Sequence, residues 1–339
     1  MNAVPLTPPM NAQALTLPKT KASQLRHFDL RRDLLPVADL VELCFAENLD
    51  GDGRLYIRQM RQAASSPTAL ALATAASGRG DLPMSGFVWV EGGSLVGNLS
   101  LIPHHYGRRR LYLMANVAVH PNHRRRGIAR ALTEAALQEV ERRGGRELWL
   151  QADETNLAAV QLYRGMGFTE KMSRTSWRAR PQAEQAGGPG GGIRVRERGP
   201  SDWPVQQSWL KENYPADVTW QLPLDLKLLQ PGWRGSLERA LSERRIVQWS
   251  AERNGELLGV LSWQSSSLET DRLWLATGAQ QEDEIIPQLM HSALAELEPR
   301  RNLALNYPGG RATKALQAAG FHAARTLVWM SYPWKKNDA

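Results

Sequence analysis

Apolar residues recur along the chain with two spacings, and each spacing predicts one type of element. Helical spacing predicts three helices in the first half, over residues 34–48, 128–142 and 157–166. Continuous or alternating apolar runs predict four strands there, at residues 87–90, 95–102, 111–119 and 148–151. Asp33 is expected to cap the first helix. Strands that alternate with helices indicate an α/β fold of the α+β kind, a mixed and mostly antiparallel sheet flanked by helices.

The same order of elements occurs twice. Four short matches relate the two halves at offsets that fall from 168 to 153 residues: Arg26 with Arg194, residues 91–100 with 253–262, Ile128 with Ile285, and Gly167 with Gly320. A duplicated fold whose second copy has lost loop residues gives such a series. A glycine-rich stretch without apolar periodicity separates the copies and is typical of a flexible linker. The predicted parts are a disordered lead 1–22, a first domain 23–180, the linker 181–192 and a second domain 193–335.

Composition excludes several classes of protein. The 339 residues correspond to about two domains of ~150 residues each, and 42% apolar residues are ample for two packed cores. Cys44 is the one cysteine, which excludes an internal disulfide and a multi-cysteine metal site. The D-G-D-G run at 50–53 is too short for a calcium loop and favours a turn. No apolar run is long enough to cross a bilayer, and the first residues lack a basic segment, so we expect a cytoplasmic protein without a membrane partner.

The net charge of +8 is concentrated in the first half. Residues 1–186 hold 24 lysines and arginines against 17 acidic residues, whereas residues 187–339 hold 18 against 17. Arginines gather at 108–110, at 124–126 and around 142–146, and the first and third clusters favour an ordinary solvated surface. The nearly neutral second half and the few aromatic residues near these clusters disfavour nucleic acid as a partner.

The most informative stretch runs from residue 116 to residue 135. A buried strand ends at Val119, a short turn follows, and a long helix begins at about Gly127. The first amides of a helix have no acceptor within the helix, and the helix dipole adds partial positive charge beside the arginines of 124–126. The pattern predicts a site for a phosphate or pyrophosphate, which the small Gly127 and Ala129 allow to approach the backbone. A P-loop lysine and the glycine spacing of dinucleotide-binding folds are absent.

Two motifs lie in and after this stretch. Arg124-x-x-Gly127-x-Ala129 follows a V-A-V-x-P strand end, and N-x-x-A-x-x-L-Y-x-x-x-G-F runs from Asn156 through Tyr163. In both, the chain resembles the GNAT (GCN5-related N-acetyltransferase) superfamily of acyl-CoA-dependent N-acyltransferases, closely over residues 87–169. The resemblance implies two tandem GNAT-like domains and acetyl-CoA as the co-substrate, with no metal.

The resemblance also implies roles for individual residues. The loop and helix start that would hold the CoA pyrophosphate comprise Arg124, Arg125, Arg126, Gly127, Ile128, Ala129 and Arg130. Backbone groups of the strand end Val117, Ala118 and Val119 would pair with the pantetheine arm as an added strand does. Asn156 would hydrogen-bond the same arm. Tyr163 follows two helical turns later on the same face, where its phenol would serve as the general acid for the CoA thiolate.

The group that deprotonates the acceptor is not identified by a motif. Some similar members of the family have a glutamate where this chain has Gln151. Glu47, in an acidic segment beside the first helix, is the catalytic candidate. His104, His105, Asp153 and an ordered water are the weaker alternatives.

The second copy lacks the same chemistry. At the matching offsets an acidic run, 281–284, replaces the three arginines and the glycine and would repel a pyrophosphate. Asn156 and Tyr163 correspond to Gly309 and Leu316. The second domain is therefore predicted to be a degenerate GNAT-like copy kept for packing, for shaping the acceptor site or for binding a partner.

These observations predict an N-acetyltransferase that transfers an acetyl group from acetyl-CoA to a primary amine by direct attack in a ternary complex. The amine belongs to a small molecule or to a protein N-terminus, and the enzyme is a monomer or homodimer. The alternative is a non-catalytic acyl-CoA-binding sensor or interaction module.

Overall fold

The computed structural model describes residues 24–49, 51–66, 85–106, 109–180, 192–242, 244–266, 270–297 and 301–334. The predicted lead 1–22 and nearly all of the predicted linker lie outside these residues. Among the helices of the described part, none has the length and apolar character that crossing a bilayer requires.

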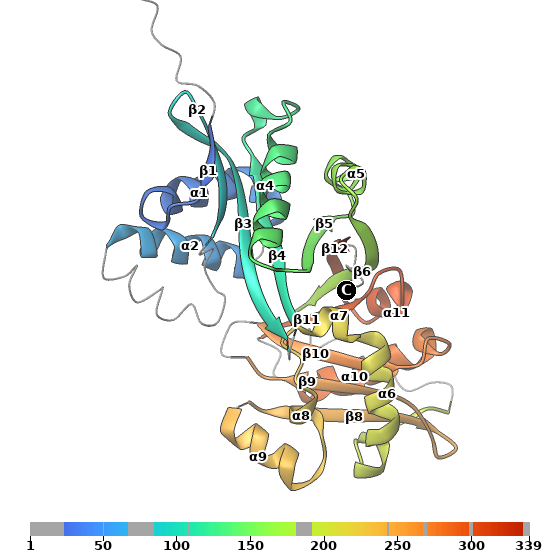
Figure 1. Cartoon of the computed structure of the whole chain (residues 1–339). Coiled ribbons are helices and arrows are strands. Elements are labelled where there is room, and N and C mark those ends of the chain that lie inside the picture. The colour runs from blue at the N-terminus through green and yellow to red at the C-terminus, as the bar shows by residue number, and fades with distance from the viewer. Residues whose placement is uncertain are drawn as a thin grey trace, which may run out of the picture.

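Twelve strands form one continuous sheet (Figure 1). The first half contributes β1 (Gln24–His27), β2 (Gly86–Glu91), β3 (Ser94–Tyr106), β4 (Arg109–Val119), β5 (Glu147–Asp153) and β6 (Thr169–Ala179). The second half contributes β7 (Arg194–Glu197), β8 (Ile246–Arg253), β9 (Glu256–Gln264), β10 (Thr270–Thr277), β11 (Asn302–Pro308) and β12 (His322–Pro333). The order across the sheet is β1-β2-β3-β4-β5-β12-β6-β11-β10-β9-β8-β7. Among the described strands, only β4 with β5 and β10 with β11 pair in parallel, so the predicted mixed, mostly antiparallel fold is confirmed.

Helices cover both faces of the first half's strands. They are α1 (Leu30–Phe45), the 3-10 turn η1 (Ala46–Asn48), α2 (Gly51–Ser65), the 3-10 turn η3 (Pro121–His123), α4 (Ile128–Arg142) and α5 (Leu157–Gly165). Phe87 and Val88 are neighbours on β2, so their side chains point to opposite faces. Phe87 packs in the core that includes α4 and α5, and Val88 in the core of α1 and α2. The sheet thus has an α4–α5 face and an α1–α2 face.

Most predicted elements of the first half occur, and two local predictions were wrong. The predicted helix 128–142 coincides with α4. Helix α1 begins at Leu30 because Asp29, and not Asp33, accepts hydrogen bonds from the first free amides of the helix. Asp33 is buried and pairs with Arg26 at 2.6 Å. The D-G-D-G run, predicted as a turn, opens helix α2 at Gly51.

The second half repeats this arrangement. Its helices are the 3-10 turn η4 (Pro200–Asp202), α6 (Trp203–Asn213), α7 (Ala216–Thr219), α8 (Leu226–Leu229), α9 (Gly232–Ser242), α10 (Glu282–Glu296) and α11 (Thr313–Ala318). In each half an arginine of the first strand pairs with a buried aspartate at the start of the next helix. Arg196 lies 2.7 Å from Asp202, as Arg26 lies 2.6 Å from Asp33.

The two halves exchange their last strands. The last strand of the second half, β12, lies between β5 and β6 of the first half, with Leu327 opposite Asp153. The last strand of the first half, β6, lies between β12 and β11, with Trp177 opposite Leu305. Each half therefore borrows a strand from the other to extend its sheet beyond its own fifth strand.

Aromatic residues of the second half complete the first half's packing. Tyr332 on β12 packs edge-on against Phe168, with ring centroids 5.4 Å apart. On the α1–α2 face, Trp220 packs against Trp149 and Trp329 at 6.2 and 6.1 Å. The first half's core therefore depends on residues from the end of the chain.

Candidate active site

Strands β4 and β5 lie side by side over only part of their length. Residues 112–114 pair with 148–150, and the pairing stops there although both strands continue. On its other side β4 carries a bulge, because Asn116 and Val117 together stand opposite one residue of β3. Asn116 has φ of 51°, a left-handed conformation. A bulge bends its strand, so β4 turns away from β5 and the sheet opens at this point.

Helix α4 begins beside the end of β4. Gly127 has φ of 80°, which glycine adopts without the strain that a side chain brings. The first bond of the helical pattern runs from the amide of Ala131 to the carbonyl of Gly127, at 3.0 Å, so the amides of residues 128–130 have no acceptor inside the helix. Arg124, Arg125 and Arg126 are exposed around this helix start. The arrangement can bind an anion such as a pyrophosphate.

Helix α5 begins where β5 ends. The side-chain oxygen of Asn156 accepts a hydrogen bond from the amide of Ala159 at 3.1 Å, so Asn156 caps the helix. Two turns later Tyr163 is buried and packs edge-on against Phe168 at 5.8 Å. Burial raises the pKa of the Tyr163 phenol, which keeps its proton at neutral pH. A protonated hydroxyl can serve as a proton donor.

A cavity of about 390 Å³ occupies the opening between β4 and β5. Asn156, Ala159 and Tyr163 line it from one face of α5. The first half adds residues of α1, α2 and the two strands, among them Cys44, Phe45, Tyr56, Asn116, Val117, Gln151 and Asp153. The second half adds Gln221, Arg325 and Leu327. Both halves therefore build one cavity.

The predicted cofactor residues lie in and around this opening. Val117 and Asn156 line the cavity, and the exposed Arg124–Gly127 segment lies at the start of α4. Ala118 and Ile128 are buried in the two cores, so only their backbones are available to a ligand. The carbonyl of Val119 already accepts hydrogen bonds from the Arg124 Nε at 3.1 Å and the Cys44 Sγ at 3.4 Å.

Two arginines at the start of α4 form ion pairs within the protein. Arg126 lies 3.3 Å from Glu91, and Arg130 lies 4.0 Å from Glu134, one turn later. Ala129 is half-buried in the first turn of α4.

The predicted bases are separated by the fold. Glu47 is exposed on η1 and is not part of the cavity lining, which includes Asp153 as its one carboxylate among the described residues. His104 packs against Trp220 at 5.0 Å, and burial lowers the pKa of this imidazole. His105 is exposed on the same strand.

Two polar contacts at the cavity involve residues that belong to neither sequence motif. The Asn116 side-chain amide donates to the Tyr56 hydroxyl at 3.0 Å. Burial raises the pKa of Tyr56 to about 12, although the bond from Asn116 opposes the shift. Gln151 donates a hydrogen bond to Gln221 of the second half. These pairs are distant in the chain, so no spacing in the sequence indicates them.

Comparison with known proteins bears on the same region. Residues 54–168 match the family model described as "Acetyltransferase (GNAT) family", and these residues contain β4, α4, β5 and α5. A tandem GNAT protein from the clavulanic acid biosynthesis pathway shares the fold over 94% of this chain and 100% of its own, with a TM-score of 0.50 and 16% identity. The first half of the chain therefore contains a GNAT domain, and it carries the family's motifs. The second half shares the fold of the tandem GNAT protein.

Other relatives match a shorter part of the chain. The [Ribosomal protein bS18]-alanine N-acetyltransferase of Escherichia coli strain K12 is 42% identical over 62 residues, 18% of this chain and 42% of that protein. The mycothiol acetyltransferase of Thermobispora bispora is 47% identical over 53 residues, 16% of this chain and 18% of that protein. The matches thus span less than half of these curated relatives. A GNAT structure from Sphaerobacter thermophilus covers 91% of this chain and 95% of its own, with a TM-score of 0.54 and 14% identity.

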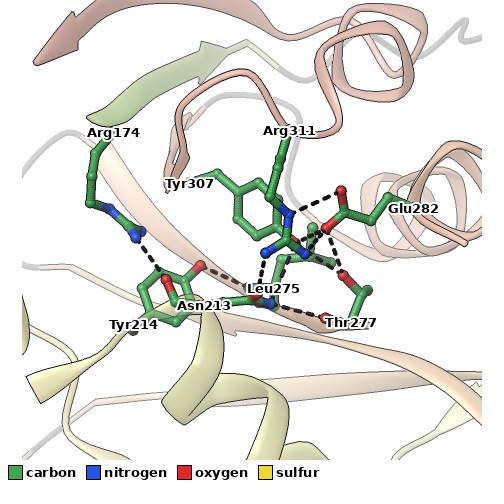
Figure 2. Close-up of polar contacts among 8 residues, drawn as sticks. All are labelled: Arg174, Asn213, Tyr214, Leu275, Thr277, Glu282, Tyr307 and Arg311. Atoms are coloured by element: carbon green, nitrogen blue, oxygen red, sulfur yellow. Dashed lines mark hydrogen bonds and ion pairs between the residues drawn. The ribbon is translucent and has the colours of Figure 1, made fainter. Parts of the chain in front are cut away.

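In the second half a network of side chains occupies the corresponding place (Figure 2). Glu282, the first residue of α10, is buried and pairs with Arg311. The Tyr307 hydroxyl donates to Glu282 at 2.5 Å and lies 3.0 Å from the Thr277 hydroxyl. Arg311 also donates to the side-chain oxygen of Asn213 at 3.0 Å. The polar side chains at this place in the second half are therefore paired with one another.

Across the described part of the chain, no group of three or more His, Cys, Asp and Glu side chains is arranged to hold a metal ion.

Proposed function

We propose that the first GNAT domain transfers the acetyl group of acetyl-CoA to a primary amine. The observation that carries this proposal is that an anion site and a proton donor are linked by neighbouring residues, since Arg124 and the cavity-lining Cys44 both donate to the carbonyl of Val119. The start of α4 offers free amides and Arg124, Arg125 and Arg126, and the cavity beside it holds the protonated phenol of Tyr163. An anionic cofactor with a reactive thioester at its far end fits this combination.

Different groups at the site complement the pyrophosphate and the pantetheine arm of CoA. The free amides of residues 128–130 would donate hydrogen bonds to the pyrophosphate, with Arg124 to Arg126 adding positive charge. The edge of β4 after Met114 has no strand beside it toward β5, so Val117 can pair with an amide of the pantetheine arm. The side-chain amide of Asn156 keeps its N–H donors while its oxygen caps α5, so it can donate to the same arm.

Tyr163 acts at the leaving group. The amine nitrogen attacks the thioester carbonyl carbon, the carbon–sulfur bond breaks, and the sulfur takes the phenol proton. The raised pKa of Tyr163 holds the proton in place until the thiolate forms. The proton that the amine loses then returns to the phenolate through solvent, so protons balance over one turnover.

The structure favours a different general base from the one that the sequence indicates. The sequence indicates Glu47, but this residue is exposed on η1 and does not line the cavity. Asp153, which lines the cavity, accepts hydrogen bonds from the amide and hydroxyl of Thr155 at 3.0 and 2.6 Å through one oxygen. Its second oxygen is available to take the amine proton. We therefore favour Asp153, acting directly or through a water, over Glu47.

Release of CoA thiol tests the proposal. The purified protein is mixed with acetyl-CoA and each member of a panel of primary amines, and the acetylated amine is identified by mass spectrometry. Thiol release that depends on the amine and matches the product in amount is expected. Tight binding of acetyl-CoA with no amine-dependent release would favour a non-catalytic acyl-CoA-binding sensor instead.

A further inference from the structure

The second half contributes a wall to the cavity, and this wall lies on the α1–α2 face of the sheet. Trp329 of β12 stands opposite Gln151, and Leu327 opposite Asp153. Trp329 packs in a cluster with Leu113, whose neighbour Tyr112 points into the α4–α5 core. Directly opposed residues and residues two apart on one strand share a face. The cavity wall made by β12 is therefore on the face away from α4 and its cationic start.

Arg325, two residues before Leu327, lines the cavity on the same side. Its position has a counterpart in the other half. Thr175 and Thr326 face each other on the exchanged strands, and their hydroxyl oxygens are 2.9 Å apart. The residue before each is an arginine, Arg174 on β6 and Arg325 on β12. Each arginine is thus carried by the strand that one half lends to the other.

Arg174 shows what an arginine does at this position. It is 2% exposed, and its guanidinium group donates to the carbonyl of Asn213 at 2.7 Å (Figure 2). It also donates to the side-chain and backbone oxygens of Asn306 at 2.5 and 3.0 Å. The guanidinium plane lies over the ring of Tyr214, 5.0 Å from its centroid. The position therefore brings an arginine to oxygen acceptors beside the fifth strand of the partner half.

Arg325 has the same origin but different surroundings. It is exposed, and no residue in the described part of the chain forms a hydrogen bond or ion pair with its guanidinium group. Asp153, at the position that matches Asn306, directs one oxygen to Thr155. The N–H donors of the Arg325 side chain are therefore not used by the described residues, and the side chain borders the cavity that the substrate enters.

We propose that Arg325 binds a carboxylate of the acceptor, so that the preferred substrates are amines that also carry a carboxylate, such as amino acids. This inference rests on the proposed acetyltransferase function and adds the substrate class. A guanidinium group presents paired N–H donors that match the two oxygens of a carboxylate. With the carboxylate at Arg325, the amine of a short substrate reaches toward Asp153 and the opening between β4 and β5. The second domain would then select the substrate that the first domain acetylates.

The test compares acceptors that differ only in this group. Amino acids and their carboxamides are assayed in pairs with the wild type, Arg325→Ala, Arg325→Lys and Lys171→Ala. Lys171 is exposed on β6 and outside the cavity lining, so its variant removes the same charge elsewhere. Arg325 is exposed, so Arg325→Ala should keep the fold, and thermal unfolding checks this.

We expect the wild type to prefer the amino acid to its carboxamide. Arg325→Ala should lower kcat/KM for the amino acid about 10- to 100-fold, through a higher KM for the acceptor, and leave the carboxamide nearly unchanged. Arg325→Lys should restore part of the loss, and Lys171→Ala should behave as the wild type.

Two results would overturn this inference while the proposed function stands. One is turnover of other amines with no preference for the carboxylate-bearing member of any pair. The other is an equal fall for both members of a pair in Arg325→Ala. If the wild type acetylates no amine at all, the proposed function itself is wrong and the substrate class falls with it.

Discussion

The hydroxyl oxygens of Thr175 and Thr326 lie 2.9 Å apart at the centre of the twelve-stranded sheet. Thr175 belongs to β6 of the first half and Thr326 to β12 of the second. Their strands pair with each other and with the fifth strand of the opposite half. The core of each half is therefore completed by residues of the other half, which are distant in the sequence.

Removal of β12 should unfold the first half's site. A chain that ends before residue 322 loses the partner of β5, and with it Trp329 and Met330, which are both buried. Loss of a large buried side chain costs about 2–5 kcal/mol, and a strand contributes several such losses, against a total stability of about 5–15 kcal/mol. Amide exchange in α5 should rise and acetyl-CoA binding should disappear. A control chain that ends after Trp334 should keep both, and a 321-residue chain with wild-type binding would refute the shared core.

Gly127 and Gly144 allow a matched test of the anion site. Both have positive φ, 80° and 69°, and a Cβ at either would meet no atom within 4 Å. Each change to alanine should therefore cost a similar amount, about 1 kcal/mol, in the free energy of unfolding. They lie at opposite ends of α4, so Gly127→Ala should weaken acetyl-CoA binding about 10-fold and Gly144→Ala should leave it unchanged. Calorimetry measures both, and equal affinities would remove the helix start from the cofactor site.

We expect one acetyl-CoA per chain. In the second half Glu282 and Arg311 pair with each other where the first half has a cationic helix start. Arg311→Ala should lower the free energy of unfolding by about 3 kcal/mol or more, because the buried Glu282 carboxylate loses its cationic partner. The variant should not create a second site. Titration calorimetry on the wild type and this variant gives the stoichiometry. Two equivalent sites in the wild type would contradict the assignment.

Acid should weaken the fold through Asp202. The Arg196 guanidinium beside this carboxyl lowers the pKa from its usual 3.8 to about 2, against the opposing effect of burial. A carboxyl whose pKa is lower in the folded state stabilises the fold above its unfolded pKa, and this contribution is lost as the pH falls through the folded value. The midpoint of urea unfolding should therefore fall between about pH 4 and pH 2.

Asp202→Asn should be less stable at neutral pH and should show a smaller fall over the same range. Glu256→Gln, a change at an exposed position on β9, is the control and should follow the wild type. Parallel pH profiles for wild type and Asp202→Asn would show that this ion pair makes no contribution.

The sequence predicts the local parts of this architecture well. Helix α4, the hairpin of β2 and β3, and the shared face of Asn156 and Tyr163 follow from periodicity and short motifs, because their determinants lie within a few turns. Matching residues of the two halves by their sequence is less reliable for arginines that form ion pairs. The repeat matches Arg26 to Arg194, whereas the arginine that pairs with the buried aspartate at the start of the next helix in the second half is Arg196.

The sequence does not predict the strand exchange or the second half's contribution to the cavity. A strand such as β12 has the same alternating pattern whether it pairs with its own half or with the other, so periodicity cannot choose its neighbour. Gln221 and Arg325 enter the site only because of that choice. Their roles depend on contacts between distant segments, which no spacing along the chain encodes.

The central claim is tested most directly by Tyr163→Phe, with Tyr112→Phe as its control. Both tyrosines are buried in the same core, but the Tyr112 hydroxyl has no hydrogen-bond partner among the described residues and does not line the cavity. Steady-state kinetics with acetyl-CoA and an accepted amine should show kcat lowered about 10²- to 10⁴-fold in Tyr163→Phe, with little change in KM for acetyl-CoA. Tyr112→Phe should keep the wild-type kcat. An unchanged kcat in Tyr163→Phe, with the chemical step rate-limiting, would contradict the account.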